Sequence, residues 1–171
     1  MLEIKDFDIA FKGLSLGSHT FDYELDDTFF ELFAYDELNH FDLKAEVVLL
    51  KTERLLTLSF HVKGHVQAIC DVSAEPFNLP LERSFELHVK FGPEENKEDD
   101  ELWILHEDEY RVNIAQILYE EMVLAIPAKR IHPDVENGSM ENEIMKKLKE
   151  QQTKKNTAID PRWDKLKDLL N

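Results

Sequence analysis

The chain reads Leu55-Leu56-Thr57-Leu58-Ser59-Phe60-His61-Val62-Lys63 in the stretch that decides its fold. Apolar residues fill the even positions from 56 to 62, and polar or charged residues fill the odd positions from 57 to 63. Successive side chains of a β-strand point to opposite faces of the sheet, so this alternation predicts a strand with one face in the core and the other in water.

Strand-like stretches continue on both sides of it. Residues 20–25, 44–51, 66–72 and 84–91 have the apolar and β-branched content of strands, residues 63–65 are expected to form a turn, and residues 102–105 could form a last short strand. Residues 2–11 are expected to form a strand with a bulge. Strands in this number, without long helices between them, predict an α+β fold with an antiparallel β-meander or barrel-like body.

Two helices are predicted in the body. Asp26 or Asp27 supplies an N-cap for a short helix over residues 28–35. From residue 113 the period changes, because apolar residues recur at helical spacing as far as 126, and Pro127 stops the helix. This amphipathic helix is expected to pack against the sheet.

The C-terminal part of the chain has a different pattern. Asn137-Gly138-Ser139 marks a break, and residues 140–155 carry an apolar stripe too narrow to bury much surface. A short final helix is expected after Asp160-Pro161, with Asp160 as its N-cap and Pro161 at its first position. We therefore expect a β-rich body over residues 1–135, including the 113–126 helix, and a helical C-terminal arm over residues 136–171.

Charge separates the body from the tail. Residues 1–127 hold 10 Lys or Arg against 28 Asp or Glu, a net charge of −18, whereas residues 128–171 hold 10 against 8, a net charge of +2. An acidic body repels the phosphates of nucleic acids, so DNA is not expected as a partner and any RNA contact should come from the tail. The body favours a basic protein instead.

The protein is expected in the cytoplasm. Residues 1–6 show neither the basic nor the apolar region of a signal peptide, and no stretch approaches the roughly 18 to 20 apolar residues of a membrane span. The single cysteine, Cys70, cannot form an internal disulfide, which suits a reducing compartment.

No catalytic residue, metal site or cofactor is predicted. His61 and His65, like His88 and His106, lack the spacing of a structural zinc site, and histidines in strands are expected on the solvent face. Cys70 is expected to be buried as a small apolar residue, since the sequence identifies no base beside it. A metal-dependent hydrolase that uses the histidines and the acidic residues near 100 is a third alternative.

The tail holds the candidate partner-binding residues. Arg162 and Trp163 stand in the first turn of the final helix, and Lys165 and Lys167 follow. Trp and Arg are the residues that most often anchor interfaces, and a Trp ring can also stack on a nucleic-acid base. The alternative is that Trp163 folds back and fixes the final helix to the body.

Three segments of the chain carry a family resemblance. They are the strand from Gly64 to Cys70, the helix end Glu120-Glu121-Met122-Val123-Leu124-Ala125-Ile126-Pro127, and the terminal Asp160-Pro161-Arg162-Trp163-Asp164-Lys165-Leu166-Lys167-Asp168-Leu169. Together they resemble the YceD family, the large ribosomal RNA subunit accumulation proteins, from Val62 to the C-terminus. The resemblance implies a bacterial or organellar cytosolic factor, not an established enzyme, that is needed for accumulation of large-subunit ribosomal RNA (rRNA).

This chain departs from the family pattern at two places. Many members look as if they carry a second cysteine three places after the first, where this chain has Ser73. They also look cysteine-rich after the Pro127 helix, where this chain has His132-Pro133-Asp134-Val135-Glu136-Asn137-Gly138. A metal or redox role of those cysteines cannot operate here, whereas the Asp-Pro-Arg-Trp motif is retained in full.

The leading hypothesis is a non-enzymatic accessory factor for large ribosomal subunit assembly. Its expected partner is a ribosomal protein or large-subunit rRNA, bound through Arg162, Trp163, Lys165 and Lys167. The rival hypothesis is an acidic protein-binding module that shields a basic protein, such as a free ribosomal protein, without touching RNA.

Overall fold

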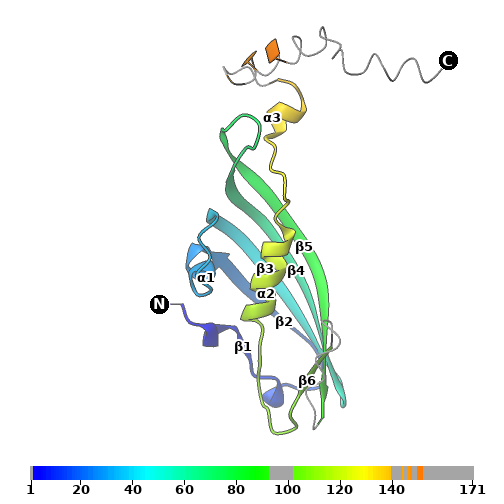
Figure 1. Ribbon diagram of the computed structural model, residues 1–171. Coiled ribbons are helices and arrows are strands. Elements are labelled where there is room, and N and C mark those ends of the chain that lie inside the picture. Colours follow the sequence, from blue (N-terminus) through cyan, green and yellow to red (C-terminus); the bar gives the residue numbers. More distant parts are fainter. Residues whose placement is uncertain (1, 93–101, 140–143, 145, 148–149, 152–171) are drawn as a thin grey trace, which may run out of the picture. The chain divides into compact units, whose positions relative to one another are not determined.

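Figure 1 shows the computed structural model of the chain, which describes residues 2–92, 102–139, 144, 146, 147, 150 and 151. These residues fall into two compact units. The first comprises the residues up to 68 together with 77–128, and the second comprises 69–76 together with the described residues from 129 onward. The predicted boundary between the β-rich body and the C-terminal arm, after residue 135, stays a prediction.

A five-stranded sheet forms the body of the protein. Its strands lie in the order β2 (Gly17–Asp26), β3 (Asn39–Lys51), β4 (Leu55–Ile69), β5 (Pro76–Phe91) and β6 (Leu102–Leu105). β3 is antiparallel to β2 and β4, whereas β6 runs parallel to β5. Side-chain contacts pair Thr57 with His88 and His61 with Ser84, so β4 and β5 run in opposite directions. The α+β prediction is confirmed, and over the described residues the sheet stays open, with β2 and β6 at its edges.

The alternation in β4 places the core as predicted. Leu56, Leu58, Phe60 and Val62 are all at most 2% exposed. The register pairs Phe60 with Val47 and Leu58 with Leu49 on β3, and those partners are buried as well. Each such side chain contributes about 1.5–3 kcal/mol by leaving water.

The expected turn at residues 63–65 is wrong, because β4 continues through Gly64 to Ile69. The register shifts between Asn39 and Asp42 on β3, opposite this part of β4. Gly64 has a φ of +153°, and a Cβ added to it would lie 2.0 Å from the backbone oxygen of Asp42. A glycine inside a strand thus marks a close approach of two backbones here, and not a reversal of the chain.

The expected N-terminal strand over residues 2–11 is also wrong in most of its length. The chain forms two 3₁₀ turns, η1 (Ile4–Phe7) and η2 (Phe11–Gly13), around the two-residue strand β1 (Asp8–Ile9), which pairs with β7 (Val112–Asn113). The apolar positions at 7, 9 and 11 are buried as an alternating pattern requires. Asn113 holds η1, since its Nδ2 donates to the Ile4 carbonyl and to Asp8 Oδ1, both at 2.7 Å.

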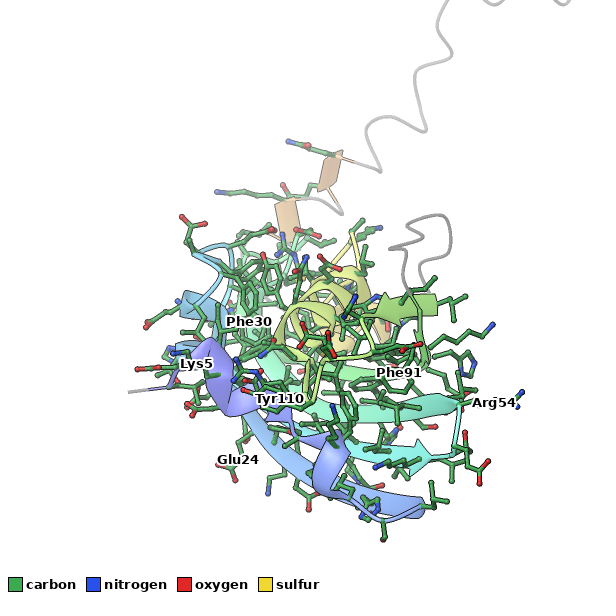
Figure 2. The ribbon with its side chains drawn as sticks, turned by 90° about the horizontal axis from the view of Figure 1, so that it is seen from below. Lys5, Glu24, Phe30, Arg54, Phe91 and Tyr110 are labelled. Carbon is green, nitrogen blue, oxygen red and sulfur yellow. The ribbon has the colours of Figure 1, made fainter. Side chains whose placement is uncertain are left out.

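Two helices lie on one face of the sheet, which we call the inner face (Figure 2). The short helix α1 (Asp27–Glu31) has Asp26 as its N-cap, since Asp26 Oδ1 accepts from the N–H groups of Thr28 and Phe29. The longer helix α2 (Ala115–Ala125) has Ile126 as its C-cap, directly before Pro127, which was predicted to stop it. Figure 2 shows Phe30 on the side of the sheet that carries α2 and Glu24 on the opposite side.

The second unit contains a helix that was not predicted, α3 (Pro133–Glu136). Of the predicted arm, the structure describes residues 144, 146, 147, 150 and 151 beyond the Asn137-Gly138-Ser139 break, and all five are helical. The predicted final helix lies outside the described residues. Among the helices that the structure describes, none has the length and apolar character needed to cross a membrane.

Candidate functional site

The turn between β4 and β5 organises the second unit around one sulfur atom. The Cys70 N–H donates to the Glu75 carbonyl, and the Ala74 N–H donates to the Cys70 carbonyl, each at 2.9 Å. Ala74 takes the left-handed conformation that such a tight reversal requires, with a φ of 59°. The reversal brings Ser73 back beneath the side chain of Cys70.

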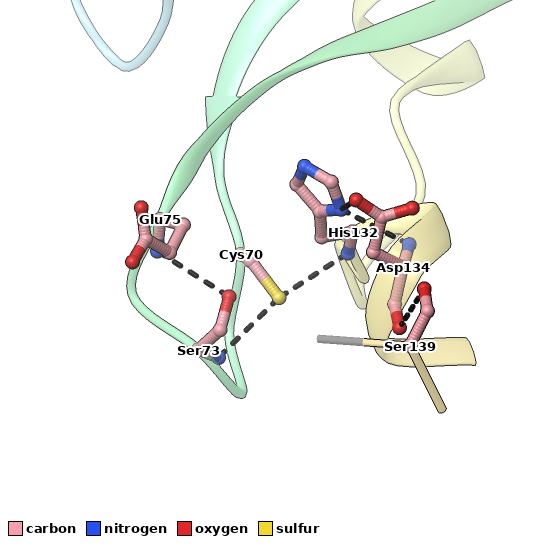
Figure 3. A network of polar contacts seen from close by, with 6 residues as sticks. All are labelled: Cys70, Ser73, Glu75, His132, Asp134 and Ser139. Carbon is pink, nitrogen blue, oxygen red and sulfur yellow. Dashed lines mark hydrogen bonds and ion pairs between the residues drawn. The ribbon is translucent and has the colours of Figure 1, made fainter. Parts of the chain in front are cut away.

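Backbone N–H groups from two segments of the chain point at the Cys70 sulfur (Figure 3). The Ser73 N–H donates to Sγ at 3.4 Å, and the His132 N–H donates to it at 3.2 Å. Cys70 is 2% exposed, which confirms its expected burial. Ser73 is 1% exposed, and among the described residues it is the polar one that is buried.

The segment after α2 runs along this turn. The Asp71 N–H donates to the Arg130 carbonyl at 2.8 Å, and the Arg130 N–H donates to Asp71 Oδ2 at 2.7 Å. Together with the bond from His132 to the sulfur, these contacts hold residues 130–132 against the turn. We call Cys70, Asp71, Ser73, Arg130 and His132 the Cys70 cluster.

His132 also starts α3. Its Nδ1 accepts from the Asp134 N–H at 3.0 Å, and Pro133 occupies the first helical turn, where its missing N–H leaves no donor unsatisfied. Ser139 closes the far end, since its hydroxyl donates to the Asp134 carbonyl at 3.3 Å. His132 therefore contacts the turn through its backbone N–H and caps the following helix through its ring.

The surroundings of the thiol change its pKa. Desolvation by burial is the largest influence and raises the pKa of Cys70. Hydrogen bonds from the Ser73 hydroxyl and from the backbone N–H groups of His132, Ser73 and Val72 act together in the opposite direction, because they stabilise the thiolate. The result is a pKa of about 7, against an ordinary value of 9.0.

The cluster is built to hold chain segments together by hydrogen bonds to sulfur. The donors to the sulfur are the hydroxyl and N–H of Ser73 and the N–H groups of Val72 and His132, none of which can act as a base. Nδ1 of the His132 ring is engaged by Asp134. Over the described ranges, no group of three or more His, Cys, Asp or Glu side chains could hold a metal ion.

The structure places three of the predicted site residues. Cys70 lies in the cluster just described. Glu121 lies on α2, where its Oε2 accepts from Arg83 Nε of β5 at 2.8 Å, and Pro127 follows the C-cap of α2. Asp160, Pro161, Arg162, Trp163, Lys165 and Lys167 lie outside the described residues.

The sequence pattern missed most of the cluster. His132-Pro133-Asp134 carries the signal of a helix start, a capping side chain followed by proline, and could have revealed α3. The pairing of Asp71 with Arg130 has no signal in the sequence, because the two residues are 59 positions apart. Ser73, and His132 at the start of the stretch 132–138, both donate a backbone N–H to the same sulfur atom.

Comparison with known proteins gives one match. The family model described as Large ribosomal RNA subunit accumulation protein YceD matches residues 58–170. This span covers most of β4, the Cys70 cluster, α2 and the tail. Neither the curated proteins nor the solved structures include a match to the chain.

Proposed function

The chain belongs to the YceD family, the large ribosomal RNA subunit accumulation proteins, and from this membership we propose that it is a non-enzymatic accessory factor for assembly of the large ribosomal subunit. The family description implies a role in accumulation of large-subunit rRNA. The match over residues 58–170 is the observation that carries the proposal. The description names an accumulation factor, which supports a non-enzymatic role. The place of action in this proposal is the cytoplasm.

In this proposal the two parts of the chain have different tasks. The β-rich body, residues 1–135, acts as a scaffold, and the arm, residues 136–171, carries the partner-binding side chains Arg162, Trp163, Lys165 and Lys167. The reversal of net charge between residues 1–127 and 128–171 supports this division, because an assembly intermediate offers both rRNA and basic proteins. The Cys70 cluster would fix the start of the connection between the two parts.

A second candidate function rests on the acidity of the body. A net charge of −18 over residues 1–127 favours a module that shields a basic ribosomal protein without RNA contact. The side of the sheet away from α1 and α2 supports it, since carboxylates outnumber lysines among the residues that line its depressions. The two candidates differ in whether RNA is part of the bound complex.

Ribosomal subunit profiles test the first candidate. Cells that lack this protein should show a reduced large-subunit peak and reduced large-subunit rRNA, and both should return when the full chain is expressed again. Unchanged profiles and unchanged rRNA in the deletion strain would remove ribosome assembly as the function.

Nuclease-controlled co-purification tests the binding residues. Trp163→Ala should lose the partner while its thermal melt stays within about 2 °C of the wild type, and Trp163→Phe, which retains an aromatic ring, should keep part of the binding. A large fall in melting temperature for Trp163→Ala would show instead that Trp163 fixes the final helix to the body. If basic proteins persist after nuclease treatment and remain bound to Arg162→Glu, the shielding module is the correct function.

A further inference from the structure

The outer face of the sheet, the side away from α1 and α2, carries an open groove. One depression of about 630 Å³ is lined by Asp22 and Glu24 of β2, Lys44 and Glu46 of β3, and His61 and Lys63 of β4. A second, of about 400 Å³, shares Glu46 and His61 with the first and extends to Ser84 and Glu86 of β5. The shared residues make the two depressions one groove that crosses four strands.

The strand register fixes the charge pattern along this groove. Asp22 lies directly opposite Glu46, and Glu46 lies directly opposite His61. His61 Nδ1 in turn contacts the Ser84 hydroxyl at 2.9 Å, so one row of side chains crosses β2, β3, β4 and β5. The row therefore has two carboxylates at one end and an imidazole and a hydroxyl group at the other.

The two carboxylates of this row repel each other. Directly opposed side chains on neighbouring antiparallel strands have Cβ atoms roughly 4.5–5.5 Å apart, and like charges at that distance are destabilising. Within the described part of the chain, neither Asp22 nor Glu46 has an ion pair or a side-chain hydrogen bond. The lysines of the groove belong to the next row, in which Lys44 stands between Glu24 and Lys63.

The groove fits an extended basic segment. Three intervals between four strands span roughly 14 Å, which is the length of about four extended residues. A guanidinium group between Asp22 and Glu46 would remove their repulsion and could bind a carboxylate through two parallel hydrogen bonds. A nucleic-acid backbone would be repelled by the same carboxylates.

We propose that the groove on the outer face binds an arginine- or lysine-rich segment of a basic protein, with Asp22 and Glu46 as the residues that receive its cationic side chain. The inference rests on the proposed function in one respect, which is that the segment belongs to a protein of the large ribosomal subunit. The recognition itself follows from the charge and shape of the groove.

Fluorescence anisotropy with the full chain tests the proposal, using a short fluorescein-labelled peptide with arginine at every second position as the probe. Asp22→Asn/Glu46→Gln should weaken binding by about tenfold or more, because charge-assisted hydrogen bonds are lost. The control Asp36→Asn/Glu53→Gln removes the same two charges at exposed positions outside the groove, and should change the affinity by less than about twofold.

Removal of the opposed charges should not lower the melting temperature, so the groove variant is expected to stay folded. Equal loss of affinity in both double variants would overturn the proposal, because it would reflect net charge alone. An unchanged peptide affinity in Asp22→Asn/Glu46→Gln would overturn it as well. The proposed function is tested independently of the groove. An unaltered subunit profile in the deletion strain would refute ribosome assembly, and the binding site in the groove would still stand if the peptide bound to the wild type and not to the groove variant.

Discussion

Titration of Cys70 should change the stability of this protein between pH 7 and pH 9. The thiol has a pKa of about 7 in the folded chain and 9.0 as its ordinary value, which applies when the chain is unfolded. Because the folded-state pKa is the lower one, the thiolate stabilises the fold. This contribution is complete above pH 9, decreases as the pH falls toward 7, and is absent well below pH 7, where both states are protonated.

The difference between the two pKa values sets the magnitude. It corresponds to at most about 2.7 kcal/mol in the free energy of unfolding. Cys70 stands in a turn whose residues Asp71 and Glu75 are exposed, so solvent screening reduces this to about 1 kcal/mol. Cys70→Ala should also lose about 1–3 kcal/mol at every pH, because the N–H groups of Ser73 and His132 lose their acceptor.

Urea unfolding under reducing conditions, at a series of pH values from about 6 to 10, measures both effects. The wild type should gain about 1 kcal/mol relative to Cys70→Ala as the pH rises through the window from 7 to 9. Cys70→Ser is the matched control, because its hydroxyl can accept the same hydrogen bonds and does not titrate in this range. Parallel pH profiles for all three proteins would refute a stabilised thiolate.

Two further substitutions test the fold by the same unfolding measurement. Gly64→Ala should lower the unfolding free energy by about 3 kcal/mol or more, because the added Cβ would meet the Asp42 carbonyl oxygen and the φ of residue 64 is +153°. Gly13→Ala is the control, and it should change the unfolding free energy by less than about 0.5 kcal/mol because a Cβ added there has no heavy atom within 4 Å. Equal effects at the two glycines would contradict the close approach of β3 and β4. Glu121→Gln should lower the unfolding free energy by only about 0.5 kcal/mol, because the side chain of its partner, Arg83, is 46% exposed to water. A decrease above about 2 kcal/mol would show that this ion pair has a larger structural role.

The pattern of residues predicted the elements that bury one face. Alternation identified the core side chains of β4, helical spacing identified α2, and Pro127 marked its end. These predictions succeed because an element that packs on one side must repeat its apolar residues with its own period. The same rule failed for residues 2–11, where Phe7, Ile9 and Phe11 are buried but Ile4 is 47% exposed, and 3₁₀ turns replace the extended chain.

The candidate site was predicted only in part. Burial of Cys70 follows from its residue type and its place in a strand-like stretch. The role of its sulfur as an acceptor does not, because the His132 N–H that reaches it comes from a segment 62 positions away. The tail motif around Trp163 was identified by resemblance, and its contribution to binding stays a prediction.

The sequence by itself determined the α+β class, the acidic body, the core face of the sheet and membership of the YceD family. Only the tertiary structure decided that β6 runs parallel to β5, that β4 passes through Gly64, and that Asp22 opposes Glu46. The reason is physical. Periodicity records whether a side chain faces water, which is a local property, whereas contacts between distant segments depend on strand order and register, which arise when the whole chain packs.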